Sequence, residues 1–340
     1  MRTAVKFVLA VALLALGGAA RAAPVGLRAD VVFSEPSPLA SGPEIARRLL
    51  SPLAAAQIEE GLARSGRALS DQSIDLADER FTLYVPAQAP PGGYGLLVFV
   101  PPWPDARLPQ GWASVLDRAG VIFVSAARSG NDANVVGRRE PLALLGLQNV
   151  LARYPVDRAR VWVGGFSGGS RIALRLALAY PDVFKGALLN AGSDPLGEGA
   201  PPIPPKDLFA QFQAGSRLVY LTGRQDEAAI SADAASLRSL QDWCVTGAVR
   251  QISAFAGHEP ADPASLARAL AALDTPPAAN PQQLAVCRAD LERRVQDALA
   301  RVEALGRRGD RDAAKARLLE VDRRFGGLAA PRSVELWRGG

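Results

Sequence analysis

The chain has 340 residues, of which 49% are hydrophobic and 21% are charged. This length and apolar content suffice to bury a large core, and they exclude an intrinsically disordered protein. The formal net charge is +5, but three of these charges lie in the first 22 residues and leave +2 for the remainder. Because the other arginines are interspersed with acids, the composition argues against a nucleic-acid-binding protein.

The first 22 residues have the pattern of a signal peptide. Two basic residues precede the apolar run 7–16, and Ala20-Arg21-Ala22 supplies the small residues that a signal peptidase recognises. We expect cleavage after about Ala22, and hence a periplasmic or secreted protein. The apolar run is short for a membrane span, so we expect no stable membrane anchor, with an uncleaved anchor as the alternative.

Residues 23–70 are predicted to form an irregular and helical segment ahead of the main domain. The stretch 24–40 is rich in proline and serine and is predicted to be irregular. Ser51-Pro52 predicts a helix that runs to about Leu62, because serine is a favoured N-cap and proline a favoured first helical residue. From Gln72 the pattern becomes alternating, and two short apolar stretches around 74–76 and 81–85 predict an antiparallel hairpin at a sheet edge.

Six continuous apolar runs follow the hairpin and are separated by helical stretches. They cover residues 96–100, 121–124, 161–163, 187–189, 218–221 and 252–255. Strands that are apolar on both faces and alternate with helices are typical of a parallel sheet covered on both sides. The sequence therefore predicts an α/β domain over residues 71–275, with a mostly parallel eight-stranded sheet flanked by helices.

A Gly-x-Ser-x-Gly motif follows the fifth predicted strand. It reads Gly165-Phe166-Ser167-Gly168-Gly169 and precedes a helical stretch that ends at Tyr180-Pro181. Glycines at these positions suit a sharp strand-to-helix turn that projects Ser167 beside amides of the helix N-terminus. We therefore predict that Ser167 is a nucleophile, with a glycine-rich turn without chemistry as the alternative.

His258 is the only histidine of the chain and follows the last predicted strand. It is therefore the only candidate for the base of a Ser-His triad. Asp226, just after the strand 218–221, is the preferred acid to orient the imidazole. Asp194 and Glu227 remain alternatives.

From about Gln72 to Asp274 the chain resembles the α/β-hydrolases. The resemblance is carried by the motif 165–169, by Thr222-Gly223-Arg224-Gln225-Asp226 and by Gly257-His258-Glu259, in the order Ser, Asp, His. Within that superfamily the chain is similar to secreted esterases of the feruloyl esterase and polyhydroxybutyrate depolymerase type. The resemblance implies hydrolysis of a carboxylic ester, polymeric or aromatic, through an acyl-enzyme and without metal or cofactor. A serine peptidase of the same fold and a catalytically inactive binding or scaffold protein are the alternatives.

The same resemblance implies an oxyanion hole formed by the backbone N–H of Gly168 and one from the loop after strand 96–100. That loop is rich in proline, which has no N–H, so Trp103 is its candidate donor. Trp103, Arg128 and Asn131 are expected to border the substrate cleft, although an ion pair between Arg128 and Asp132 is an equal alternative. The short connection between the sixth and seventh strands predicts an open site.

A helical appendage is predicted to follow the main domain. Residues 276–281 form a proline-rich linker, and the apolar residues of 282–340 recur every three or four positions. This predicts two antiparallel helices and a tail, docked on the main domain, with a partner-binding or dimerising module as the alternative. Cys244 and Cys287, the only two cysteines, would pair in an oxidising compartment or remain as two buried thiols.

Overall fold

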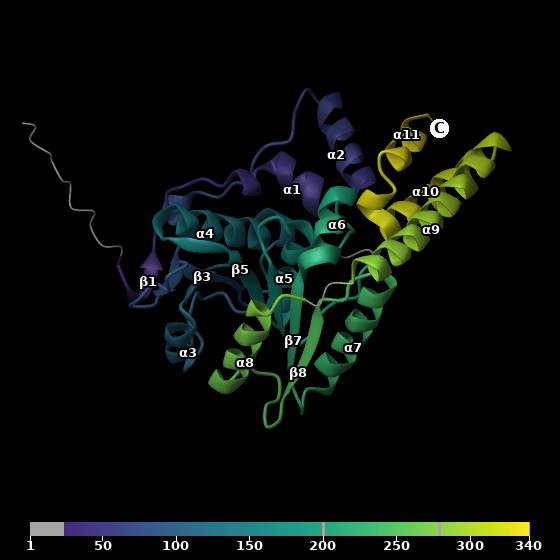
Figure 1. Cartoon of the computed structure of the whole chain (residues 1–340). Helices are drawn as coiled ribbons and strands as arrows, with labels where there is room; N and C mark the ends of the chain where they lie inside the picture. The colour runs from purple at the N-terminus through teal and green to yellow at the C-terminus, as the bar shows by residue number, and fades with distance from the viewer. Residues whose placement is uncertain (1–23, 199–200, 278–279, 340) are drawn as a thin grey trace, which may run out of the picture.

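The computed structural model of the protein describes residues 24–198, 201–277 and 280–339 (Figure 1). The predicted signal peptide lies outside these residues. The described elements, in chain order, are β1 (Gly26–Val31), η1 (Pro38–Ala40), α1 (Gly42–Leu49), α2 (Pro52–Arg64), η2 (Leu76–Asp78), β2 (Phe81–Val85), β3 (Tyr94–Val100), α3 (Trp112–Ala119), β4 (Val121–Ala126), η3 (Val135–Arg139), α4 (Glu140–Arg153), β5 (Val156–Phe166), α5 (Gly168–Ala179), β6 (Gly186–Asn190), α6 (Lys206–Gly215), β7 (Arg217–Gly223), α7 (Glu227–Asp242), β8 (Ala248–Ser253), α8 (Pro263–Asp274), α9 (Pro281–Arg307), α10 (Arg311–Phe325), η4 (Gly326–Leu328) and α11 (Arg332–Gly339).

One eight-stranded sheet organises the fold. Its strand order is β1-β2-β4-β3-β5-β6-β7-β8, in which the pairs β1–β2 and β2–β4 are antiparallel and all other pairs are parallel. The strands β3, β4 and β6 are buried along their whole length, as expected for strands covered on both faces. The predicted α/β class, with a mostly parallel sheet of eight strands, is confirmed.

The predicted hairpin is wrong, because the antiparallel partner of β2 lies much earlier in the chain. Gly26 pairs with Val85, so β1 belongs to the stretch that was predicted to be irregular. β1 is a mostly exposed edge strand and shows little apolar alternation. Residues 72–75 form no strand, and Asp75 instead caps η2 by accepting from Ala77 N at 2.9 Å.

The bounds of the last strand also differ from the sequence prediction. The last strand is Ala248–Ser253, so Phe255 lies outside the sheet with 93% of its surface exposed. The chain leaves the sheet at Ser253, whose carbonyl accepts from Arg224 N at 2.9 Å. By contrast, the predicted start of α2 is confirmed, since Ser51 accepts from Ala54 N and Pro52 is the first helical residue.

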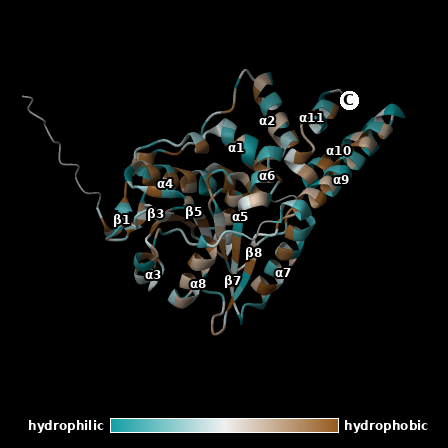
Figure 2. Ribbon diagram, in the orientation of Figure 1, coloured by the Kyte–Doolittle hydropathy of each residue, from teal (hydrophilic) through white to brown (hydrophobic). Residues whose placement is uncertain are grey.

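Helices cover both faces of the sheet (Figure 1). One core lies between the sheet and the side of α1, α4, α5 and α6, and a second core lies on the side of α3 and α8. The flanking helices such as α7 and α9 carry both hydrophobic and hydrophilic residues along their length (Figure 2). Among the described residues, no helix combines the length and apolar character of a membrane span.

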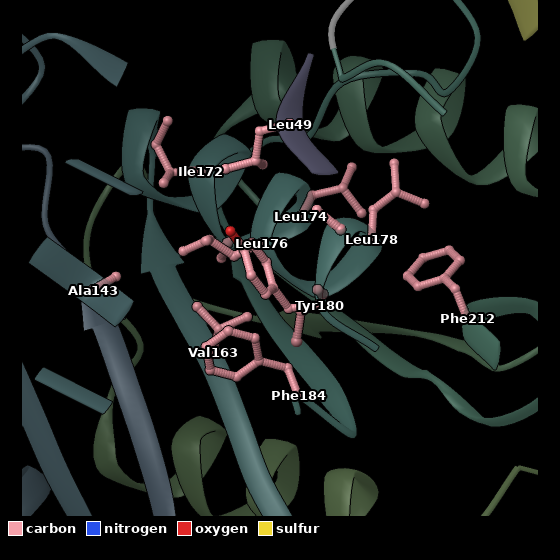
Figure 3. Packing of buried hydrophobic residues seen from close by; sticks show 14 of the residues in the cluster. Leu49, Ala143, Val163, Ile172, Leu174, Leu176, Leu178, Tyr180, Phe184 and Phe212 are labelled. Carbon is pink, nitrogen blue, oxygen red and sulfur yellow. The ribbon is translucent and has the colours of Figure 1, made fainter. Parts of the chain in front are cut away.

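The helix α5, which follows Ser167, is held firmly in the larger core. Leu174 and Leu178 lie in one cluster with Leu49 of α1, Val163 of β5 and Phe212 of α6 (Figure 3). Fully burying side chains of this size stabilises a fold by about 1.5–3 kcal/mol each. The N-terminus of α5 is therefore a rigid position for a reactive side chain.

The C-terminal helices pack against the rest of the chain. α10 runs back along α9, and α11 contacts α2. Asp322 of α10 accepts from Leu53 N at 3.2 Å and from the Ser51 hydroxyl, and Arg288 of α9 donates to Gln213 of α6 at 2.7 Å. A disulfide joins Cys244, just after α7, to Cys287 of α9.

Candidate active site

Ser167 lies at a sharp turn between β5 and α5. Its backbone has φ 53° and ψ −121°, a conformation that L-residues rarely adopt, and its N–H donates to Asn190 O at 2.8 Å. A Cβ on Gly165 would lie 2.1 Å from Gly169 O, and a Cβ on Gly169 would lie 1.9 Å from Val100 O. Both motif glycines are thus required by close backbone approach, as a nucleophile turn demands.

The structure brings Ser167, His258 and Asp226 together from three separate loops. His258 Nε2 lies 2.9 Å from Ser167 Oγ, and His258 Nδ1 lies 2.5 Å from Asp226 Oδ2. Asp226 is buried at the start of α7, where its other oxygen accepts from Ala229 N at 3.2 Å. This places the imidazole between a hydroxyl and a carboxylate, the arrangement in which a histidine can take a proton from serine.

The two alternative acids lie elsewhere. Asp194 forms an ion pair with Arg171 of α5 at 2.9 Å. Glu227 is the exposed first residue of α7. Of the three carboxylates considered from the sequence, the structure therefore places only Asp226 in contact with the imidazole.

The N-terminus of α5 provides backbone amides beside Ser167. Gly168 is the first residue of this 12-residue helix, so its N–H lies at the positive end of the helix dipole. The ring of Phe166 lies 5.0 Å from the His258 ring and 5.9 Å from that of Trp103, between centroids. The Arg107 guanidinium lies 4.2 Å from the centre of the Trp103 ring. A series of ring contacts thus runs from the imidazole through the buried Phe166 to the partly exposed Trp103.

The two other predicted cleft residues differ in their surroundings. Arg128 pairs with Glu79 at 2.9 Å and donates to Asp78 O at 2.8 Å, so the pairing considered with Asp132 is not the one found. The Arg128 guanidinium is thus engaged by the segment 78–79, and its contact with a substrate stays a prediction. Asn131, in contrast, is exposed and lies against Gly168.

Sequence reasoning missed Asn190, a buried residue that ties the three catalytic-loop segments together. Its carbonyl accepts from Ser167 N, its Nδ2 donates to Leu221 O at 2.9 Å, and its Oδ1 accepts from Ala261 N at 2.8 Å. These bonds connect the serine turn, the end of β7 and the segment after His258. The only signal in the sequence is a polar residue directly after the apolar run 187–189.

Arg139 was missed as well, and it links two loops at the edge of the site. It is 4% exposed, and its guanidinium donates to Ser129 O and to Pro101 O at 3.0 Å each. Burial lowers the pKa of Arg139 to about 10, against the attraction of Glu140. The residue remains charged at neutral pH and fixes the loops after β3 and β4 to one another.

A second buried carboxylate lies behind Asp226. Burial raises the pKa of Asp233 to about 6, and the negative charge of Asp226 acts in the same direction. The Thr222 hydroxyl, which donates to Asp233, and the positive charges of Arg250 and Arg171 oppose this rise. Asp233 makes no contact with His258 and does not belong to the hydrogen-bonded series of Ser167.

The site is open to solvent at the imidazole. The His258 side chain is 51% exposed. The contacts of α9, α10 and α11 run to α2, α6 and the ends of neighbouring loops. Within the described ranges, no group of three or more His, Cys, Asp or Glu side chains is arranged to hold a metal ion.

The solved structures to which this chain is similar include remote neighbours. No protein-family model matches the chain, and no curated protein matches it. Similar solved structures include a ferulic acid esterase, which is 15% identical with a TM-score of 0.41 over 56% of this chain and 88% of that chain. An S-formylglutathione hydrolase from Staphylococcus aureus is 13% identical with a TM-score of 0.43, over 57% and 92% of the two chains. A protein described as a dipeptidyl aminopeptidase IV from Bacteroides ovatus is 17% identical with a TM-score of 0.42, over 57% and 33%.

At these identities and TM-scores, the neighbours carry no information about the reaction. The strand order of this chain, its parallel sheet from β4 to β8 and its strained serine between β5 and α5 are those of the α/β-hydrolase fold.

Proposed function

We propose that this protein is an exported serine hydrolase that cleaves carboxylic esters. The observation that carries the proposal is the position of the only histidine of the chain, which lies within hydrogen-bonding distance of both Ser167 Oγ and Asp226 Oδ2. Three side chains separated by up to 91 residues meet in this way at one edge of the sheet. A glycine-rich turn without chemistry would not require that convergence.

The proposed reaction has two steps of acyl transfer. Ser167 Oγ attacks the ester carbonyl carbon while its proton passes to His258 Nε2, and Asp226 stabilises the resulting imidazolium. The Gly168 N–H stabilises the negative charge on the carbonyl oxygen. When the bond to the alcohol breaks, the alcohol leaves with the proton from His258. Water then attacks the acyl-enzyme and gives a proton to His258, which passes it to Ser167 Oγ as the bond to the acyl group breaks and the acid leaves.

Two features support an ester presented by a large or aromatic molecule. The imidazole is half exposed, so the reacting atoms are reachable by a polymer chain. Trp103 is partly exposed, and its ring lies 5.9 Å from that of the buried Phe166, which in turn lies 5.0 Å from the imidazole ring. An aromatic acyl or alcohol group can pack on Trp103 beside the site.

Labelling with a fluorophosphonate probe tests the proposal. The wild-type protein should be modified at Ser167, and a Ser167→Ala variant should not. Rapid hydrolysis of p-nitrophenyl acetate, with no cleavage of peptide anilides, would support an esterase. The reverse preference would make the protein a peptidase, and an unlabelled, inert protein would be a binding or scaffold protein.

Export is the second part of the proposal. It is supported by the basic, apolar and small-residue pattern of residues 1–22. N-terminal sequencing of the protein purified from its natural source should find a chain that begins at about Ala23. A chain that still carries the apolar run would contradict export by cleavage.

A further inference from the structure

The loop after β3 is poorly suited to supply a backbone donor to an oxyanion. Pro101, Pro102 and Pro104 have no N–H, which leaves Trp103 as the one N–H among these four positions. The loop also presents carbonyl groups to its neighbours, because Pro102 O accepts from Asn131 N at 2.9 Å and Pro104 O accepts from Arg128 N at 2.6 Å. The loop therefore offers at most one N–H, that of Trp103, and a side chain of the neighbouring segment can be the second donor beside the Gly168 N–H.

The Asn131 carboxamide lies directly beside Gly168. A Cβ built on Gly168 would lie 2.1 Å from Asn131 Oδ1 and 3.1 Å from Asn131 Nδ2. The carboxamide thus occupies the space that a side chain at position 168 would need. Gly168 is the residue after the nucleophile, so a polar group in this space lies next to the N–H expected to face the oxyanion. Asn131 is also exposed and hence accessible to substrate.

Asn131 is held in place by its backbone and by its neighbours. The Asn131 N–H donates to Pro102 O. Two residues earlier, the Ser129 carbonyl accepts from the buried Arg139 at 3.0 Å. A Cβ on Gly130 would lie 2.8 Å from the Trp103 carbonyl carbon, so the two loops are also in close backbone contact. An oxyanion donor is effective when it is positioned before the reaction begins, and these contacts fix the backbone from which the Asn131 side chain projects.

We propose that the Asn131 side chain is an oxyanion donor of this enzyme, acting together with the Gly168 N–H. A half turn of the carboxamide about its last torsion exchanges Oδ1 and Nδ2, so the group can direct an N–H at the developing charge. The inference rests on the proposed serine hydrolase function. It assigns to the Asn131 side chain the role of second oxyanion donor that the sequence analysis gave to the Trp103 backbone N–H.

The test compares Asn131→Ala and Asn131→Asp with the wild-type protein and with Asp132→Ala. Asp132 is the exposed next residue, so its variant controls for a change in the same loop. Asn131→Asp keeps the shape of the side chain but removes its donors. The measurements are kcat and KM for p-nitrophenyl acetate and the inhibition constant of a trifluoromethyl ketone, whose adduct with a serine carries an oxyanion.

Loss of one oxyanion donor typically lowers kcat by about 10²–10³-fold. Since Asn131 is exposed, we expect kcat to fall by about 100-fold in both variants while KM stays nearly unchanged. The inhibition constant of the trifluoromethyl ketone should rise by a similar factor. Asp132→Ala should remain close to wild type. If Asn131→Ala does not fold, the isosteric Asn131→Asp decides the matter by the same measurements.

Two outcomes would overturn the inference while leaving the proposed function intact. One is a kcat within about threefold of wild type in both Asn131 variants. The other is a raised KM with unchanged kcat, which would make Asn131 a contact to the ground-state substrate. If the wild-type protein itself is inert and its behaviour is unaffected by Ser167→Ala, the proposed function fails, and the inference fails with it.

Discussion

Replacement of Asp226 by Asn should abolish most of the activity without disturbing the fold. Asp226 Oδ2 lies 2.5 Å from His258 Nδ1, so in the wild-type protein Nδ1 carries the proton and Nε2 is free to accept one from Ser167. An Asn side chain can donate its own N–H to Nδ1. This favours the opposite tautomer, in which Nε2 carries the proton and cannot act as the base.

The size of the effect follows from this change of tautomer. The same replacement in a Ser-His-Asp triad lowers kcat by about 10⁴-fold. Here the imidazole is 51% exposed, so water competes for its nitrogens and we expect a loss of about 10³–10⁴-fold. This corresponds to about 4–5 kcal/mol of transition-state stabilisation.

The assay is kcat and KM for p-nitrophenyl acetate, with circular dichroism to verify that the variant is folded. Asp194→Asn is the matched control, because Asp194 is the rival acid from the sequence and pairs with Arg171 instead. We expect this control to keep kcat within about threefold of wild type. A folded Asp226→Asn protein with near-normal kcat, or a large loss in Asp194→Asn, would refute the assignment of Asp226 as the acid.

Three further predictions concern stability, each measured by urea unfolding. Gly169→Ala should cost about 3 kcal/mol, because its Cβ would lie 1.9 Å from the immobile Val100 carbonyl oxygen, and a loss below about 0.5 kcal/mol would contradict this. The Cys244–Cys287 disulfide closes a separation of 43 residues, so reduction should cost about 4 kcal/mol, whereas a Cys244→Ala, Cys287→Ala protein should be insensitive to reductant. The pKa of Asp233 is raised to about 6, so its stabilising contribution is complete below about pH 3.8 and is lost as the pH rises through about 6. Asp233→Asn should therefore be more stable than wild type by up to about 3 kcal/mol at pH 7.5 but not at pH 4, and an equal difference at both pH values would count against the reasoning.

The elements that sequence reasoning placed correctly are those with a strong local pattern. The apolar runs that became β3, β4, β6 and β7 are buried on both faces, so nearly every side chain of such a strand is hydrophobic. β1 was not predicted because it is an edge strand whose residues are mostly exposed, so it has no continuous apolar run. Its pairing with β2 depends on contacts across some fifty residues of chain, which no local spacing can reveal.

Some residues of the candidate site could likewise be predicted from the sequence, and others could not. The motif glycines and the single histidine are visible in the sequence because each depends on residue type alone. The Asp226 carboxylate, and not that of Asp194, lies beside the imidazole. The alignment of the parallel strands β6, β7 and β8 brings the loop after β7 next to the loop that carries His258.

The sequence by itself determined the α/β class, the serine turn and the candidate base, since apolar periodicity and glycine spacing are properties of short segments. Only the tertiary structure decided the partner of β1, the pairing of Arg128 with Glu79 and the contact between Asn131 and Gly168. Each of these is a contact between two segments that are distant in the chain and lie side by side in the fold. The register of the sheet fixes such pairings, and that register is a property of the whole core.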